Sequence, residues 1–168
     1  MSLHIVSNRL TVVPFDISMA QSVHLNSLDD DNRRFLPDEV FETVDDAADT
    51  IEYLIGCYGD YSRPQVYAVL LDGVQIGHVQ LVPCGDGFEV GYHIGKTYTG
   101  RGYASEAASA FLPVIMRCAG ISCVYGICHA ENAASVRVLE KCGFSLVYSG
   151  DGMYQGESAP VVKYEYII

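Results

Sequence analysis

The middle of the chain has an alternating pattern of hydrophobic and polar positions. Residues 65–71 alternate, and Asp72-Gly73 then forms a turn of the kind that joins antiparallel strands. The alternation continues through 74–82 and, after a short glycine-containing turn, through 88–94. Turns this short cannot connect parallel strands. The pattern therefore predicts a three-stranded antiparallel meander.

The segment before this meander favours one strand and two helices. Residues 3–13 alternate loosely, which predicts a first strand. Asp16 can cap a helix over roughly 17–27, and Thr43 can cap a second helix that ends near position 57. The charged segment 29–41 between them predicts a loop or a broken helix.

After the meander, the spacing of apolar residues becomes helical and then changes twice more. Apolar residues recur with a helical period from Tyr103 until Gly120 ends the pattern. The apolar run 123–128 predicts a buried strand, and because it follows a crossover helix it should lie parallel to 88–94. The remaining predicted elements are a helix capped by Asn132 that ends before Gly143, and two strands, 144–148 and 160–168, joined by the turn-rich segment 149–158.

Composition limits the class of protein. The 168 residues predict a single domain over 1–168. No apolar run reaches the roughly 20 residues of a membrane span, and the N-terminus has no signal-peptide pattern, so we expect a cytoplasmic protein away from membranes. The six cysteines contain no Cys-x-x-Cys and no His cluster accompanies them, which predicts buried free thiols and no metal.

The formal net charge of −11 argues against nucleic-acid binding, which depends on Lys and Arg against phosphates. A negative protein suits a cationic substrate such as an amine or a basic peptide. A charge that only keeps the protein soluble explains the value equally well.

A glycine-bearing loop joins the strand 88–94 to the helix that begins near Tyr103. Its sequence T-G-R-G-Y-A places Gly100 and Gly102 where backbone N–H groups can converge on one anion at a helix N-terminus. This predicts a pyrophosphate site. A dinucleotide fold would need a third glycine where Ser105 stands, and a parallel β-α-β unit around the loop.

A second motif, N-A-A-S-V-R-V-L-E-K-C-G-F, follows at 132–144. Together with T-G-R-G-Y-A and the preceding G-Y-H-I, it makes the chain resemble the GNAT N-acetyltransferase superfamily, in particular the ribosomal-protein N-terminal acetyltransferases. The resemblance implies a mixed α/β fold of order β-α-α-β-β-β-α-β-α-β-β. About seven mostly antiparallel strands would be flanked by about four helices, with acetyl-coenzyme A as co-substrate.

The resemblance also implies roles for individual residues. The backbone of Ile94 would hold the acetyl and pantetheine part of the cofactor. Asn132 would bond the pantetheine arm as well as cap its helix, and Ser135 would face the thioester sulfur. The pyrophosphate would be bound by the amides of the loop, namely Thr99, Gly100, Arg101, Gly102, Tyr103 and Ala104. The Arg101 side chain either pairs with a phosphate or is solvated.

For the catalytic acid and base, the sequence offers several candidates. Many family members have a tyrosine acid where this chain has Leu139, so we expect Ser135 to replace it, with Tyr154 a remote alternative. Glu89 and His93 are the candidate bases; on a regular strand they share one face about 13 Å apart, at ~3.3 Å per residue. A bulge near Gly91 would change both facing and spacing. Each could instead be structural, and a water-mediated base stays open.

The sequence therefore predicts an acetyl-coenzyme A-dependent N-acetyltransferase that acts directly on a primary amine, either a protein N-terminus or a small amine. The alternative is a coenzyme A-binding sensor or interaction module without transferase activity. We expect segment 29–41 and the final strands to build the acceptor side. Exposed Tyr164 and Tyr166 would allow a homodimer.

Overall fold

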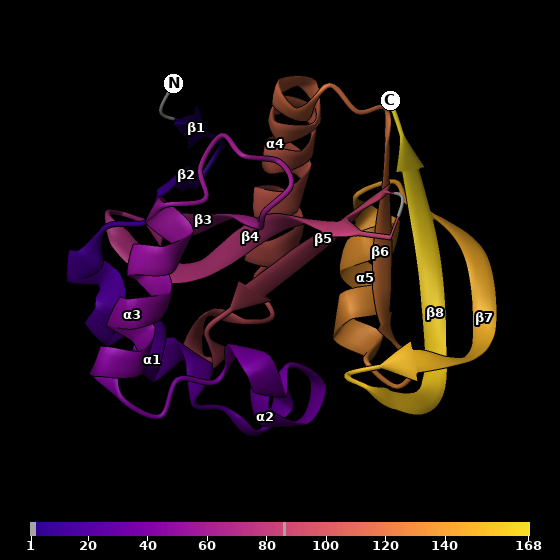
Figure 1. Cartoon of the computed structure of the whole chain (residues 1–168), viewed down its shortest axis with the longest axis horizontal. Coiled ribbons are helices and arrows are strands. Elements are labelled where there is room, and N and C mark those ends of the chain that lie inside the picture. The colour runs from indigo at the N-terminus through magenta and orange to yellow at the C-terminus, as the bar shows by residue number, and fades with distance from the viewer. Residues whose placement is uncertain (1–2, 86) are drawn as a thin grey trace.

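The computed structural model describes residues 3–85 and 87–168, which form a twisted sheet with helices on both faces (Figure 1). The strands are β1 (Ile5–Val6), β2 (Leu10–Pro14), β3 (Gln65–Leu71), β4 (Val74–Cys84), β5 (Gly87–Ile94), β6 (Cys123–His129), β7 (Ser145–Tyr154) and β8 (Glu157–Ile167). The α-helices are α1 (Ala20–Ser27), α2 (Asp30–Phe35), α3 (Val44–Ile55), α4 (Tyr103–Ala119) and α5 (Ala133–Lys141). Short 3-10 helices cover Ile17–Met19, Pro37–Glu39 and Lys96–Tyr98.

The sheet of the described residues has eight strands in the order β1-β2-β3-β4-β5-β6-β8-β7. Neighbouring strands pair antiparallel except β5 and β6, which are parallel. This confirms the predicted mixed, mostly antiparallel GNAT-like fold and the parallel position of the strand after the crossover helix.

The alternation along β3 explains how the two helical layers are attached. Tyr67 and Val69 belong to a core cluster that includes Phe111 of α4. Val66 and Ala68, one residue out of phase, pack in a second cluster with residues of α1 and α3. Successive strand residues point to opposite faces, so one strand supports both layers.

The pairing of β5 with β6 is short and decides where a ligand can enter. The two strands pair at one position, Glu89 with Tyr125. Figure 1 shows them side by side at one end and apart at the other, where the chain passes from β5 into α4. The sheet therefore opens between β5 and β6.

Three elements differ from the sequence prediction. Residues 3–13 form the hairpin β1–β2 instead of one strand, which gives eight strands where about seven were expected. Segment 29–41, predicted as a loop or a broken helix, is a broken helix and differs only in the helix count. It consists of α2, which Asp29 caps by accepting from the Asn32 amide at 2.8 Å, and the 3-10 helix Pro37–Glu39. The short helix α2 gives five α-helices where about four were expected.

The third difference is the long hairpin β7–β8. Segment 149–158 is mostly strand, with a tight turn at Gln155-Gly156. Its glycines make space for neighbouring side chains: a Cβ on Gly152 would lie 2.7 Å from Val161 Cγ2. The glycine-rich composition therefore reflects close packing within strands and not a long loop.

The surface corrects two further expectations. Tyr164 is buried and Tyr166 is partly buried against the core, so neither is the exposed aromatic that was expected, and the homodimer stays a prediction without that support. Cys57 and Cys128 are buried free thiols as expected, but Cys84 and Cys118 are exposed. Within 3–85 and 87–168, no group of three or more potential ligands could hold a metal ion. No helix in these ranges is long and apolar enough to cross a membrane.

Candidate functional site

The glycine loop and the start of α4 form an open anion site. Gly100 and Gly102 have φ values of 78° and 80°, a left-handed conformation that glycine adopts without strain. Among the described residues, no side chain caps the first turn of α4, and none lies within 4 Å of where a Cβ on Gly100 would be. The first-turn amides are therefore available to a ligand, and the helix dipole favours an anion there. A pyrophosphate fits these features.

Two adjoining cavities begin at this loop. The smaller, about 290 Å³, is lined by the loop and by Arg137 and Lys141 of α5. The larger, about 450 Å³, extends between β5, β6 and α2. Both are lined by Ile94, Thr99 and Ala104, so the loop and the interior of the cleft are continuous.

The strand register directs part of the β5 backbone into this cleft. Gly95 donates its amide to the Ile76 carbonyl oxygen, and Ile94 lies opposite Gly77 in the same ladder. In an antiparallel ladder, alternate residues bond to the same neighbour, so the amides of Tyr92 and Ile94 point away from β4 and toward β6. The β5–β6 pair lies earlier, at Glu89, which leaves these amides free to bind a ligand. The ladder with β4 has no register shift at Gly91, so the bulge considered from the sequence is not present there.

Ser135 lies in the first turn of α5 and lines the larger cavity. Its amide donates to Asn132 Oδ1 at 3.1 Å, which confirms Asn132 as a helix cap. The Tyr92 hydroxyl donates to the Ser135 carbonyl oxygen at 2.9 Å and lies 3.0 Å from Ser135 Oγ. Burial raises the pKa of Tyr92, so this phenol keeps its proton at neutral pH. Tyr92 therefore positions the serine hydroxyl at the cavity wall.

Glu89 lines the same cavity where β5 and β6 begin to diverge. Burial raises the pKa of Glu89 to about 7, and the Ile127 amide and the charge of Lys163 only partly oppose this effect. A carboxyl group with this pKa can accept a proton near neutral pH and release it again.

His93 faces the cavity from the same side of β5 but has different surroundings. Its Nε2 lies 3.5 Å from Asp29 Oδ2, and its ring lies beside that of His78, with centroids 5.8 Å apart. Burial and the neighbouring His78 lower the pKa of His93. His93 therefore belongs to a polar cluster with Asp29, which is part of residues 29–41, here called the α2 segment.

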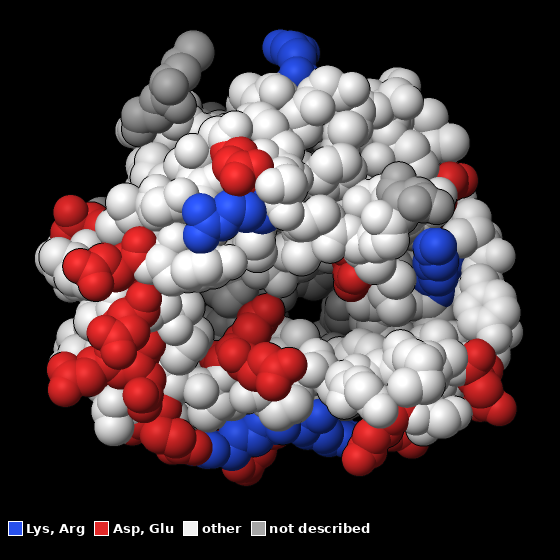
Figure 2. All heavy atoms as spheres, viewed as in Figure 1, with Lys and Arg blue, Asp and Glu red and all other residues white. Residues whose placement is uncertain are grey.

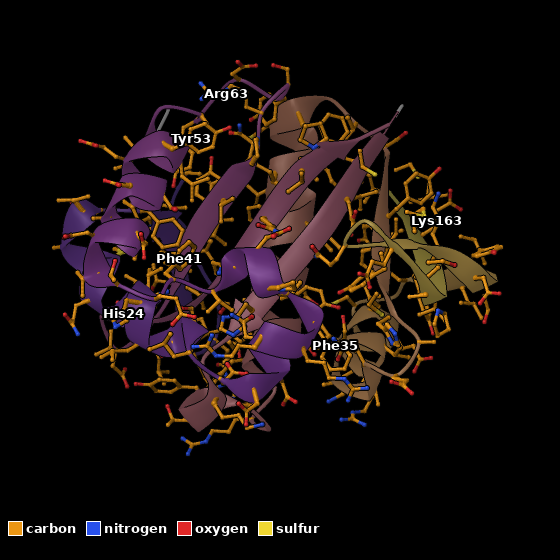
Figure 3. All side chains as sticks on the ribbon, turned by 60° about the horizontal axis from the view of Figure 1, so that its bottom comes forward. His24, Phe35, Phe41, Tyr53, Arg63 and Lys163 are labelled. Carbon is orange, nitrogen blue, oxygen red and sulfur yellow. The ribbon has the colours of Figure 1, made fainter. Side chains whose placement is uncertain are left out.

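The α2 segment crosses the cleft and is attached to its far side. Arg34 pairs with Glu131, which follows β6, and the Tyr154 hydroxyl donates to the Phe35 carbonyl oxygen at 2.6 Å. The Phe35 ring packs against His129, with centroids 5.9 Å apart, and Figure 3 shows Phe35 at the end of α2 next to the second half of the chain. Figure 2 shows a hollow in this face with acidic side chains at its rim.

Most of the residues proposed from the sequence line these cavities. Those lining the larger cavity are Glu89, His93, Ile94, Thr99, Ala104, Asn132 and Ser135, and those lining the smaller one include Gly100, Gly102 and Tyr103. Arg101 lines neither; its carbonyl oxygen accepts from Arg9, whose guanidinium lies over the Tyr103 ring. Tyr154 is bound to the α2 backbone, which does not favour it as an acid.

Sequence reasoning did not select Tyr92, Arg137 or Lys141. It also did not select Asn32 and Glu39, which line the larger cavity from segment 29–41. The basic pair lies one turn apart on α5, three and seven residues after Ala134, so a helical-face analysis relative to Ala134 could have found it. The others are brought to the cleft by contacts between distant segments, which no local pattern indicates.

A parallel strand pair that opens beside a glycine loop, with a titratable carboxyl in the opening, is the arrangement expected of the GNAT acetyltransferases that the sequence resembles. The Acetyltransferase (GNAT) domain family model matches residues 9–145, and the chain belongs to this family. As a member it is an N-acetyltransferase, and use of acetyl-coenzyme A is implied by the family.

The chain is similar to named proteins over nearly its full length. It is 28% identical over 145 residues to the uncharacterized N-acetyltransferase YnaD of Bacillus subtilis (strain 168), covering 84% of this chain and 82% of the relative. A GNAT-family acetyltransferase from Bacillus anthracis superposes with a TM-score of 0.84 at 24% identity, covering 98% of each chain. RimL, a ribosomal L7/L12 alpha-N-protein acetyltransferase solved with coenzyme A, gives 0.83 at 19% identity, covering 99% of this chain and 98% of RimL.

Proposed function

We propose that this protein moves the acetyl group of acetyl-coenzyme A directly to a primary amine. The observation that carries the proposal is the continuity of the two cavities. They join an anion site at α4 to an opening in the sheet where Glu89, Ser135 and two free backbone amides meet. One end suits a pyrophosphate, and the other provides proton acceptors and donors for acyl transfer.

The cofactor-binding residues follow from this arrangement. The first-turn amides of α4 and the Gly100–Gly102 loop bind the pyrophosphate, and Arg137 and Lys141 add positive charge on the same side. Asn132 uses its Oδ1 as a cap, which leaves its amide nitrogen for the pantetheine arm. When bound, acetyl-coenzyme A supplies an acetyl group activated as a thioester.

The chemistry of transfer is assigned to residues of β5 and α5. Glu89 takes the proton that the amine loses, because its pKa of about 7 matches that task. The amides of Tyr92 and Ile94 donate to the acyl oxygen, where negative charge develops as the new C–N bond forms. Ser135, held by Tyr92, donates a hydrogen bond to the sulfur as the C–S bond breaks and the thiolate leaves, and Ser135 keeps its proton. His93 is assigned to the acceptor wall and not to proton transfer.

Two measurements test this function. Calorimetry should detect binding of acetyl-coenzyme A, and a panel of amines should give release of free thiol with a new N-acetyl product by mass spectrometry. Glu89→Gln should keep cofactor binding and lose turnover, whereas the same change at exposed Glu157 should alter neither. Absence of cofactor binding would refute the proposal. Binding without turnover on any amine would instead favour the sensor.

A further inference from the structure

One wall of the larger cavity presents hydrogen-bond acceptors from the α2 segment. Asp29, Asn32 and Glu39 all line it. Asn32 is only 3% exposed, and its Nδ2 donates to the carbonyl oxygens of Ser27 and Glu39 at 2.9 and 3.1 Å. Its Oδ1 has no hydrogen-bond partner among the described residues. A buried amide oxygen without a donor costs free energy, so this wall is suited to a ligand that donates.

Glu39 contributes an anionic group to the same wall. One carboxylate oxygen, Oε1, accepts from Gln80 Nε2 at 3.2 Å. The other, Oε2, is buried without a hydrogen bond and lies 3.2 Å from His78 Nε2. The side chain is 24% exposed, so its exposed part lies on Oε1 and the methylene groups. Burial opposes ionisation, but His78, His93 and Gln80 together outweigh it and lower the pKa of Glu39.

A glycine in β5 fixes where this carboxylate lies. A Cβ on Gly91 would be 2.4 Å from Gln80 Nε2, so the Gln80 side chain lies directly over Gly91. Glu39 accepts from that same nitrogen and is therefore held above the middle of β5. Gly91 is two residues from Glu89, which corresponds to roughly 7 Å along a strand. The Glu39 carboxylate is thus placed roughly 7 Å along β5 from the backbone of Glu89, about the length of a short aliphatic chain.

The cavity has an excess of negative charge after its own cations are counted. Two side chains with a fixed positive charge line it, and both are paired: Arg34 with Glu131, and Lys96 with Asp31 at 2.8 Å. His93 also lines it, with its Nε2 3.5 Å from Asp29 Oδ2. Lys163 acts on Glu89 from outside the cavity lining, with its ammonium over the Tyr125 ring, and is labelled in Figure 3. Among the described residues, no Lys or Arg forms an ion pair with Asp29, Glu39 or Glu89.

We propose that the acceptor is a linear diamine or polyamine. One amine lies at Glu89 and receives the acetyl group, while a second ammonium is held by Asp29, Asn32 and Glu39. An ammonium has three N–H donors and no acceptor, which complements a wall made of two carboxylates and an unpaired amide oxygen. This inference rests on the proposed function and specifies its substrate class.

The test compares linear diamines of three to six carbons with monoamines of equal length. We expect kcat/KM for the best diamine to exceed that of its monoamine by roughly ten- to hundredfold, the range for hydrogen bonds to charged groups. Glu39→Gln keeps the shape of the side chain and should reduce this preference about tenfold or more. Asp38→Asn removes the neighbouring exposed carboxylate, which does not line the cavity, and should leave the preference unchanged.

A binding measurement separates this inference from the proposed function. Calorimetric titration of the best diamine into the protein saturated with coenzyme A should show binding that Glu39→Gln weakens by the same factor. Such binding without turnover would support the subsite and contradict the transferase proposal. Turnover with equal preference for monoamines, turnover confined to peptide N-termini without a second cation, or a preference that survives Glu39→Gln would each overturn the diamine assignment.

Discussion

Glu89→Gln is the substitution that most directly tests the chemistry of the cleft. It keeps the size of the side chain and removes its ability to accept a proton. General base catalysis contributes about 10²–10⁴-fold, so kcat/KM should fall within that range. With a pKa of about 7, Glu89 is roughly one tenth ionised near pH 6 and roughly nine tenths ionised near pH 8. The wild-type rate should therefore rise nearly tenfold across that interval, and the variant should lose this rise.

The same substitution should stabilise the fold, because the raised pKa has a cost. When an acidic group has a higher pKa in the folded protein than in the unfolded chain, the folded protein loses stability as the pH rises from the unfolded-state pKa to the folded-state pKa. For Glu89 this interval runs from 4.5 to about 7. Above this pH interval, the size of the pKa shift corresponds to a loss of about 3 kcal/mol in the free energy of unfolding. Glu89→Gln should therefore unfold at higher urea than the wild type near pH 8, and the difference should shrink toward pH 5.

Two assays test these expectations: steady-state thiol release over pH 6–8, and urea unfolding near pH 5 and near pH 8. Glu157→Gln is the control in both. A wild-type profile that is flat across neutrality would contradict the raised pKa. A steep profile that remains in Glu89→Gln would assign the base elsewhere. His93→Gln is then the informative second variant, since His93 shares the cavity.

Three other substitutions test the remaining parts of the site. Ser135→Ala should lower kcat by about tenfold or more with little change in KM for acetyl-coenzyme A, as measured by initial rates; a change confined to KM would make Ser135 a binding residue only. Gly102→Ala places a side chain at φ 80° and should weaken calorimetric binding of coenzyme A several-fold, with unchanged binding contradicting the anion site. Glu106→Gln replaces a carboxylate that accepts hydrogen bonds from Ser7 Oγ and from two Arg9 nitrogens, each at 2.7 Å. Burial opposes ionisation, but these bonds lower the pKa of Glu106, so the stabilisation is present above about pH 4.5 and is lost as pH falls further. We expect a loss of about 1–2 kcal/mol in urea unfolding at pH 7 that vanishes in acid, and a loss independent of pH would contradict this account.

Local patterns predicted the features that local geometry determines. The two-residue period, the Asp72-Gly73 turn and the Asn132 cap each depend on neighbouring residues, and the structure contains all three. Both strands of the hairpin β7–β8 were predicted, but their extension through 149–158 was missed because glycines usually indicate turns. Here Gly152 is required by Val161, a residue of the partner strand.

The cofactor half of the site could be found from the sequence because one continuous stretch carries it. The loop and the start of α4 are adjacent in the chain, and their anion-binding property follows from glycine and from helix termini. The acceptor half is different. Asn32 and Glu39 meet Gln80 and Gly91 only after α2 folds across the sheet, and the pKa of Glu89 depends on burial by elements far away in the chain.

The alternation along β5 explains how one strand can serve two substrates. Odd-numbered positions such as Glu89 and His93 turn their side chains toward the α2 segment, where the acceptor binds in our proposal. The amides of Tyr92 and Ile94 point along the sheet toward β6, where the thioester would lie. This division works only because β6 leaves β5 after one paired position. If β6 continued alongside β5, its carbonyl groups would pair with those amides, and Glu89 would lie on a closed sheet with no thioester beside it. The early separation of the two strands is therefore what converts a structural strand into the centre of the proposed reaction.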